Sequence, residues 1–263
     1  LMIMPVDLSF IKEAADLRKI KSFSMDSNFV KKSIELTKRS LECFDGSDAP
    51  IYTTAFSPSY TLRWFMRDRE EDLLQFIEED PESLVIALKS IAKSLIEFNR
   101  ILIEETGVEG FYYCVNNQNN FFADSFFTTY VAPSEREVLE KANELSDINI
   151  LHICGYDGLS NDLKLFKDFE AAAYNWDVNA EGVSLAEGKK LFGGKAVIGG
   201  FEQDQVIYTG TREEVEKATF DILDECGQVG TIIGAGCTLP TDIEEIRLEW
   251  VRQASIKYAI DNL

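Results

Sequence analysis

Short apolar segments alternate with longer amphipathic segments along most of the chain. Each short segment is rich in β-branched or aromatic residues and is bounded by Gly, Asn, Asp or Pro, which is typical of strands buried on both faces. The six segments of this kind are 51–56, 111–115, 148–153, 171–176, 196–201 and 230–234. Strands that alternate with helices form right-handed βαβ units, so the pattern predicts a parallel sheet and an α/β protein.

The amphipathic segments have helical periodicity. In the segment that begins at Pro81, apolar residues recur at intervals of 4, 3, 4, 3 and 4 between Leu84 and Leu102. They form one continuous stripe, which we interpret as a face that packs against the sheet. Further helices are predicted over 28–44, 60–77 and 242–260.

Two pairs of residues predict where further helices begin. Ser134 with Glu137, and Thr211 with Glu214, have the spacing of a capping box. No tandem repeat, low-complexity stretch or Pro/Ser-rich linker interrupts the sequence. We therefore expect a single domain over 1–263, in which 1–48 forms an irregular or truncated N-terminal part.

The charge balance narrows the class of protein. The chain has 26 Lys and Arg against 46 Asp and Glu, a net charge of −20, which argues against binding nucleic acid or an anionic membrane surface. No apolar run approaches the ~18 residues of a membrane span, and the first residues show no signal-peptide pattern. The five cysteines are odd in number and widely scattered, which favours a reduced, cytoplasmic protein in which selected thiols bind metal.

Candidate chemistry lies at the ends of two predicted strands. His152 and Cys154 are two residues apart, so both side chains point to one face of the third strand. Cys237 follows the last strand and comes directly after Gly236, which lets the backbone turn sharply. Imidazole and thiolate suit Zn²⁺, and three protein ligands with an open fourth position are typical of catalytic zinc. The alternative is a packed histidine with cysteines that act as small core residues.

Several ordered motifs resemble the uroporphyrinogen decarboxylase family. These motifs are His152-Ile153-Cys154-Gly155, Gly199-Gly200-Phe201, the segment 209–215, and Gly236-Cys237-Thr238-Leu239-Pro240, together with the segments 49–62 and 123–133. The resemblance extends from about residue 49 to the C-terminus. It implies a (β/α)8 barrel of the TIM type.

The family that the chain resembles has two branches. Its decarboxylases bind tetrapyrrole carboxylates through an Arg-Gln-Ala-Gly-Arg segment, which this sequence lacks. Its corrinoid-linked methyltransferases carry a His-x-Cys motif and a later Cys as zinc ligands, and His152, Cys154 and Cys237 are similar to that set. The resemblance therefore implies a zinc-dependent transfer of a methyl group from methyl-cobalamin, held by a partner corrinoid protein, to a small thiol.

Five further polar residues are weaker candidates. Asp177 follows a predicted strand and is a candidate fourth ligand in the resting state, although a loop or helix-capping role explains it better. Asn116 is a candidate for catalysis and Asn117 for cofactor binding, but a run of polar residues after a strand is also ordinary turn chemistry. Tyr130 is a candidate catalytic residue that lies in a family-like segment. Glu202 follows a strand end and is a candidate for cofactor binding, with a solvated loop as the alternative.

Six predicted strands are too few for a complete eight-stranded barrel, although ~250 residues suffice for one. The N-terminal strands are therefore expected to be missing or degenerate, and another copy of the chain in a homodimer is one way to cover the open sheet edges. Two alternative functions stay open. One is a uroporphyrinogen decarboxylase of tetrapyrrole biosynthesis, and the other is a non-catalytic subunit that binds a corrinoid partner.

Overall fold

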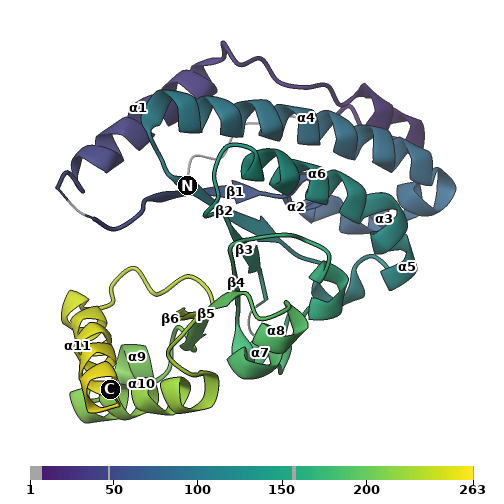
Figure 1. The fold of residues 1–263 in the computed structure, drawn as a ribbon. Coiled ribbons are helices and arrows are strands. Elements are labelled where there is room, and N and C mark those ends of the chain that lie inside the picture. The colour runs from purple at the N-terminus through teal and green to yellow at the C-terminus, as the bar shows by residue number, and fades with distance from the viewer. Residues whose placement is uncertain (1–7, 47, 156–157, 263) are drawn as a thin grey trace. The chain divides into compact units, whose positions relative to one another are not determined.

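The computed structural model describes residues 8–46, 48–155 and 158–262. Within them, strands alternate with helices as predicted, so the α/β class is confirmed (Figure 1). The strands are β1 (Tyr52–Phe56), β2 (Gly110–Val115), β3 (Ile150–Ile153), β4 (Ala173–Trp176), β5 (Ala196–Phe201) and β6 (Thr231–Ala235). All six coincide with predicted strands to within two residues at either end.

The helices connect these strands and flank them. The α-helices are α1 (Asn28–Glu42), α2 (Pro58–Phe65), α3 (Glu70–Glu79), α4 (Pro81–Thr106), α5 (Asp124–Phe126), α6 (Ala132–Asn143), α7 (Val178–Glu181), α8 (Leu185–Leu191), α9 (Val206–Thr209), α10 (Arg212–Cys226) and α11 (Glu245–Asp261). Short 3-10 helices are η1 (Ala14–Lys19), η2 (Arg67–Arg69), η3 (Gln118–Asn120) and η5 (Leu163–Phe166), and η4 (Phe127–Val131) is a π-helix. None of the described helices combines the length and apolarity needed to cross a membrane.

The chain forms two compact units. Unit 1 contains the described residues up to Val115 together with Phe122–Ile150 and Phe169–Ala171, and unit 2 contains the described parts of Asn116–Phe121, Leu151–Asp168 and Ala172–Leu263. The single domain over 1–263 stays a prediction. In the N-terminal part that was expected to be irregular, α1 is a regular helix, and residues 1–7 and 47 lie outside the described residues.

Unit 1 contains a parallel strand pair and its covering helices. β1 pairs with β2 in a register that runs from Tyr52 opposite Gly110 to Phe56 opposite Cys114. α4 packs beside α1 and α6 (Figure 1). Of its apolar stripe, Leu84 and Leu88 are inaccessible to solvent and Leu102 is buried, whereas the stripe residues between Leu88 and Leu102 are partly buried.

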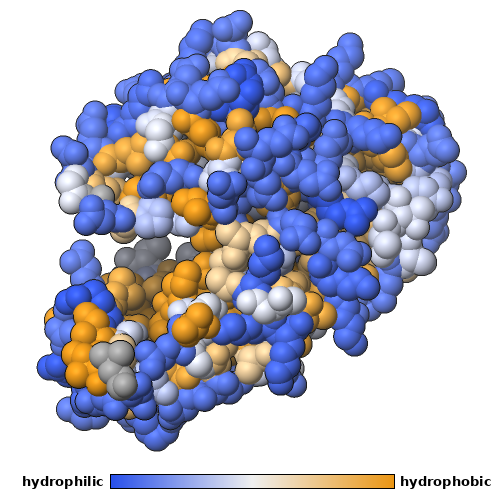
Figure 2. Space-filling model, viewed as in Figure 1, coloured by the Kyte–Doolittle hydropathy of each residue, from blue (hydrophilic) through white to orange (hydrophobic). Residues whose placement is uncertain are grey.

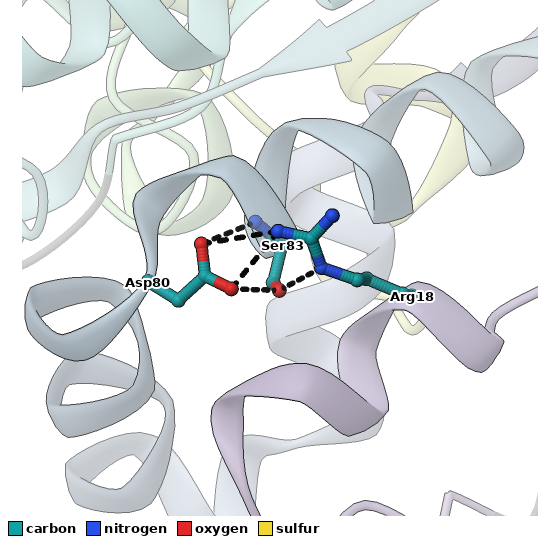
Figure 3. Close-up of polar contacts among 3 residues, drawn as sticks. All are labelled: Arg18, Asp80 and Ser83. Atoms are coloured by element: carbon teal, nitrogen blue, oxygen red, sulfur yellow. Dashed lines mark hydrogen bonds and ion pairs between the residues drawn. The ribbon is translucent and has the colours of Figure 1, made fainter.

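Arg18 fastens the N-terminal segment to the start of α4. Its Nε donates to the hydroxyl of Ser83 at 2.7 Å, and its Nη2 lies 3.0 Å from the Asp80 carboxylate (Figure 3). Asp80 also accepts from the Ser83 hydroxyl at 2.6 Å and caps α4 through the Ser83 amide. Because the Arg18 and Asp80 side chains are each at least one-third exposed, the ion pair contributes little alone, and the hydroxyl fixes its geometry.

Unit 2 contains β4, β5 and β6, and Cys237 follows the last of them. β4 pairs with β5 and β5 with β6, both in parallel, so these strands end at one edge. The predicted capping box at Thr211 and Glu214 is present and opens α10. α10 packs against α11 (Figure 1).

Two helix predictions were wrong in detail. The helix predicted over 60–77 is two helices, because the backbone leaves helical angles at Met66 (φ −106°, ψ 13°). The capping box at Ser134 and Glu137 does not form. The π-helix η4 runs directly into α6, so Ser134 lies inside a helix and its hydroxyl donates to the carbonyl of Val131 at 2.9 Å.

Candidate metal centre

His152, Cys154 and Cys237 come together in unit 2. Their ligand atoms all lie within 4.8 Å of one another, and the Cys237 sulfur is 3.8 Å from Nε2 of His152. Zinc bonds of ~2.0–2.3 Å at tetrahedral angles place donor atoms ~3.5 Å apart, so the cluster has nearly the spacing that one ion needs. His152 is 3% exposed, and both cysteines are partly buried.

Each ligand is positioned by the end of a strand. His152 is the third residue of β3 and Cys154 comes directly after β3, so period-2 geometry points both to one face. Cys237 follows β6 by two residues. Gly236 allows this approach, because a Cβ there would lie 2.6 Å from the Cα of Asp177. Only glycine brings the Cys237 backbone this close to Asp177.

Asn175 fixes the tautomer of His152. The Asn175 amide nitrogen donates to the carbonyls of Ile198 (2.8 Å) and Ala235 (3.1 Å), so its oxygen must face the imidazole. That oxygen lies 2.6 Å from Nδ1 of His152. Nδ1 therefore carries the proton, and the lone pair of Nε2 is directed toward Cys237.

The neighbours of the Cys237 thiol lower its pKa. A hydrogen bond with Cys154 lowers its pKa most, burial opposes this, and His152 lowers it further, which brings the pKa of Cys237 to about 4. Cys237 is therefore a thiolate at neutral pH, and thiolate is the form that binds zinc. An imidazole and a thiolate beside a second thiol are a donor set that suits Zn²⁺.

Hydrogen bonds hold the backbone at Cys154. Its carbonyl accepts from the side-chain amides of Gln118 (2.8 Å) and Asn161 (3.2 Å). Asn161 also donates to Glu181 through its side-chain amide (2.7 Å) and through its backbone amide. Burial raises the pKa of Glu181, while the bonds from Asn161 oppose that rise. A Cβ at Gly155 would overlap the Glu181 carboxylate, so a larger residue there would displace that side chain from Asn161.

Asp177 caps α7. Its Oδ1 accepts from the backbone amides of Asn179 (2.9 Å) and Ala180 (3.0 Å), and it is 2% exposed. The helix-capping role left open above is therefore present. Gly236 packs against Asp177, which brings that residue close to Cys237, but Asp177 is not one of the three clustered residues. A ligand role for Asp177 stays a prediction.

The other predicted site residues are distributed over both units. Asn116 and Asn117 are buried in unit 2, where the Asn117 backbone amide donates to Asn161 at 2.7 Å. Glu202, also in unit 2, accepts from the side chain of Asn179 at 2.7 Å. Tyr130 belongs to unit 1 and packs on Phe126, with ring centroids 4.7 Å apart. Roles for these four residues in catalysis or cofactor binding stay predictions.

Sequence reasoning missed Asn175, Asn161 and Glu181. Asn175 had a signal, because it is the one amide side chain within the otherwise apolar segment of β4. A polar side chain in a strand buried on both faces needs partners, and these are often part of a site. Asn161 and Glu181 had no comparable signal, since their contacts with the loop after β3 depend on how the loops fold.

The fold is thus of the parallel α/β class, and the His-Cys-Cys cluster at the ends of its strands is a candidate zinc centre. Residues 4–258 match the uroporphyrinogen decarboxylase (URO-D) family, and the chain belongs to this family. Over 255 residues it is 22% identical to the methylcobamide:CoM methyltransferase MtbA of Methanosarcina mazei, a match that covers 94% of this chain and 70% of the relative. The predicted family is thus confirmed, and the similarity to MtbA agrees with the methyltransferase branch.

Two solved structures are similar in fold. A methyltransferase from Methanosarcina mazei matches with a TM-score of 0.75 at 15% identity, over 89% of this chain and 66% of its own. A B12-independent methionine synthase from Shewanella sp. matches with a TM-score of 0.57 at 18% identity, over 92% of this chain and 70% of its own. At these identities the matches show the fold alone, and they confirm the predicted α/β barrel-type fold. The chain spans about two thirds of the length of the relatives that it matches.

Proposed function

We propose that the chain is a zinc-dependent methyltransferase that moves a methyl group from a methyl-corrinoid to a thiol. The observation that carries this proposal is the cluster of His152, Cys154 and Cys237, whose ligand atoms lie within 4.8 Å of one another. Similarity to a methylcobamide:CoM methyltransferase supports the reaction class, although the identity is 22%. The methyl-corrinoid is proposed to arrive on a partner corrinoid protein.

The residues of this chain would hold the ion and leave one position for substrate. His152 would bind through Nε2, since Asn175 keeps the proton on Nδ1. Cys237 would bind as thiolate, and Cys154 would lose its proton on binding. When bound, zinc would lower the pKa of a substrate thiol at the open position, which makes thiolate available at neutral pH. Asp177 is proposed to fill that position in the resting state.

The overall reaction balances without a further reactant. A carbon–sulfur bond forms to the substrate thiolate, and the carbon–cobalt bond of the methyl-corrinoid breaks with its electron pair left on the corrinoid. The thiol proton leaves to solvent. The contribution proposed for Asn116, Asn117, Tyr130 and Glu202 is to position the acceptor and the corrinoid.

A transfer assay tests this function. Methyl-cobalamin and coenzyme M, the acceptor in the name of the relative, are incubated with the zinc-loaded chain, and the methyl thioether is quantified by mass spectrometry. We expect catalytic turnover that is lost in His152→Ala. Carbon dioxide release from uroporphyrinogen would instead indicate a decarboxylase. Binding of a corrinoid protein without turnover of several thiols would indicate a non-catalytic subunit.

A homodimer and a cytoplasmic location stay predictions. The outward face of α11 supports the first, because it exposes Ile246 (50%), Ile256 (48%) and Ile260 (64%). Figure 2 shows apolar side chains gathered over this helix. Light scattering after size exclusion tests the dimer, and Ile256→Glu should shift it to monomer.

A further inference from the structure

Unit 1 contains a large apolar cavity that the proposed methyl transfer does not use. Its volume is about 870 Å³, and every residue that lines it belongs to unit 1. The N-terminal segment, α1, β1, α2 and α4 each contribute to its wall. Pockets that bind small molecules have volumes of roughly 300–1,000 Å³ and are lined mainly by apolar and aromatic side chains. The cavity has both properties.

Two aromatic clusters form parts of its wall. Phe56, Tyr60 and Trp64 stack in a row, with neighbouring ring centroids 4.9 and 6.3 Å apart and ring planes within 16° of parallel. The second cluster consists of Phe23, Phe29 and Phe98, and the ring centroids of Phe23 and Phe98 are 6.1 Å apart. The rings are ordered by one another, so they present a preformed apolar surface.

One buried polar group in this wall has no hydrogen-bond partner among the described residues. Asn99 on α4 is 3% exposed, and its side-chain amide nitrogen makes no hydrogen bond within the described part of the chain. A buried donor without an acceptor costs about 1–3 kcal/mol. An oxygen atom of a ligand or of a water bound in the cavity would satisfy it.

The charge of the wall selects among ligands. Among the described residues that line the cavity, Lys21 is the one that carries a charge, and none is acidic. An anionic group is therefore favoured near Lys21, and a cationic one is not.

The two polar groups of the wall, Lys21 and Asn99, lie beside different positions along α4. The backbone next to Lys21 is anchored near one place, since the Phe23 amide donates to Ser94 Oγ at 3.1 Å. Asn99 is five residues further along the helix, ~7–8 Å at 1.5 Å per residue. The wall between them is apolar, with Leu95 and Phe98 among its residues. A ligand that extends between the two groups is elongated.

We propose that this cavity binds an elongated amphiphile with an apolar chain and a carboxylate, such as a medium- or long-chain fatty acid. The carboxylate pairs with Lys21, the apolar chain lies between the two aromatic clusters, and a water at the far end of the chain accepts from Asn99, because both oxygens of a fatty acid are in the carboxylate at Lys21. The site is independent of the proposed zinc centre.

Binding is tested with dodecanoate below its micelle concentration. Titration calorimetry should show one saturable site per chain, with dodecan-1-ol bound at least several-fold more weakly and dodecyltrimethylammonium not bound. 12-Bromododecanoate should quench the fluorescence of Trp64, and Trp64→Phe should abolish most of that quenching. Because bromine quenches an indole only in close contact, the second measurement places the ligand in the cavity.

Variants distinguish binding of dodecanoate in the cavity from nonspecific binding to the protein surface. Thr54 is exposed and lines the cavity, so Thr54→Trp fills part of it and should weaken binding at least tenfold. Lys21→Glu should weaken dodecanoate binding by a similar factor. Lys31→Glu is the matched control, since Lys31 is exposed on α1 but does not line the cavity. Circular dichroism confirms that each variant is folded. The proposal is overturned if dodecanoate shows no saturable binding at millimolar concentration, if Thr54→Trp binds normally, or if the cationic amphiphile binds equally well.

Discussion

Oδ1 of Asn175 lies 2.6 Å from Nδ1 of His152, and this contact decides which nitrogen of the histidine is available to a metal ion. The Asn175 amide cannot reverse its direction, because its nitrogen donates to the carbonyls of Ile198 and Ala235. One side chain on β4 thus connects a residue of β3 with β5 and β6. The orientation of the imidazole, with Nε2 toward Cys237, is a consequence of the sheet.

Removing this contact should weaken zinc binding without removing a ligand. We expect Asn175→Leu to lower zinc affinity about 10–100-fold, the usual effect of losing a partner of a metal-binding histidine. Competition with a fluorescent chelator measures it. Asn175→Asp keeps an acceptor for Nδ1 and should retain most of the affinity. Asn179→Ala, which removes an exposed hydrogen bond to Glu202, is the matched control and should leave affinity unchanged. Equal affinity in Asn175→Leu and wild type would contradict the positioning role.

Cys237 should react as a thiolate in the metal-free protein. Its pKa of about 4 means that the ionised fraction is nearly complete by pH 6, so alkylation by iodoacetamide should rise through pH 4 and then level off. Peptide mass spectrometry follows this cysteine alone. Cys154→Ser removes the hydrogen bond that lowers the pKa most, and should move the rise to higher pH. A rate that still increases tenfold per pH unit between pH 6 and 8 would show that the pKa is ordinary.

Glu135 should make unit 1 less stable as the pH rises. Burial raises the pKa of this carboxyl to about 7 against the hydrogen bonds from Ser59 and Ser57. Because the folded state keeps the proton above pH 4.5 and the unfolded state does not, the stabilisation is complete below that pH and is lost as the pH rises through 7. Glu135→Gln should therefore gain stability relative to wild type between pH 5 and 8, by at most about 3 kcal/mol at 1.36 kcal/mol per unit.

Urea unfolding at pH 5 and at pH 8 measures the difference in unfolding free energy between Glu135→Gln and wild type. The matched control is Glu137→Gln on the exposed face of the same helix, which should show no such dependence. If the two substitutions shift unfolding equally at both pH values, Glu135 does not carry its proton in the folded state.

Gly236→Ala should disturb both stability and the metal centre. A Cβ at this position would lie 2.6 Å from the Cα of Asp177, and backbone atoms cannot move away as a flexible side chain can. We expect a loss of about 1–3 kcal/mol in the free energy of unfolding and weaker zinc binding, because Cys237 is the next residue. Thermal unfolding and chelator competition measure the two effects. Unchanged zinc affinity would show that Cys237 does not depend on this close approach.

The strands and the long helices could be predicted from the sequence because their patterns are local. The stripe from Leu84 to Leu102 and the capping box at Thr211 follow directly from spacing. The break at Met66 was missed, although six consecutive charged residues, 67–72, interrupt the apolar pattern directly after it. At Ser134 a π-helix continues into α6, so a residue with the right spacing for a cap lies inside a helix.

The candidate site was predictable only in part. His152 and Cys154 share a face by strand geometry, and Gly236 marked a sharp approach beside Cys237. Their proximity across β3 and β6 depends on the tertiary fold, as does the contact between Asn175 and His152. The cavity in unit 1 was also beyond sequence reasoning, because an unpartnered Asn99 is recognised only once its neighbours are known.

Zinc content tests the central claim most directly. The chain is purified, loaded with zinc under reducing conditions at neutral pH, passed through a desalting column and analysed for metal and protein. Our account predicts about one zinc per chain in wild type, close to none in the His152→Ala, Cys237→Ser double variant, and about one in Cys43→Ser, whose thiol is exposed and outside the cluster. Absence of zinc from wild type, or equal zinc in the double variant, would contradict the claim that His152, Cys154 and Cys237 form a metal centre.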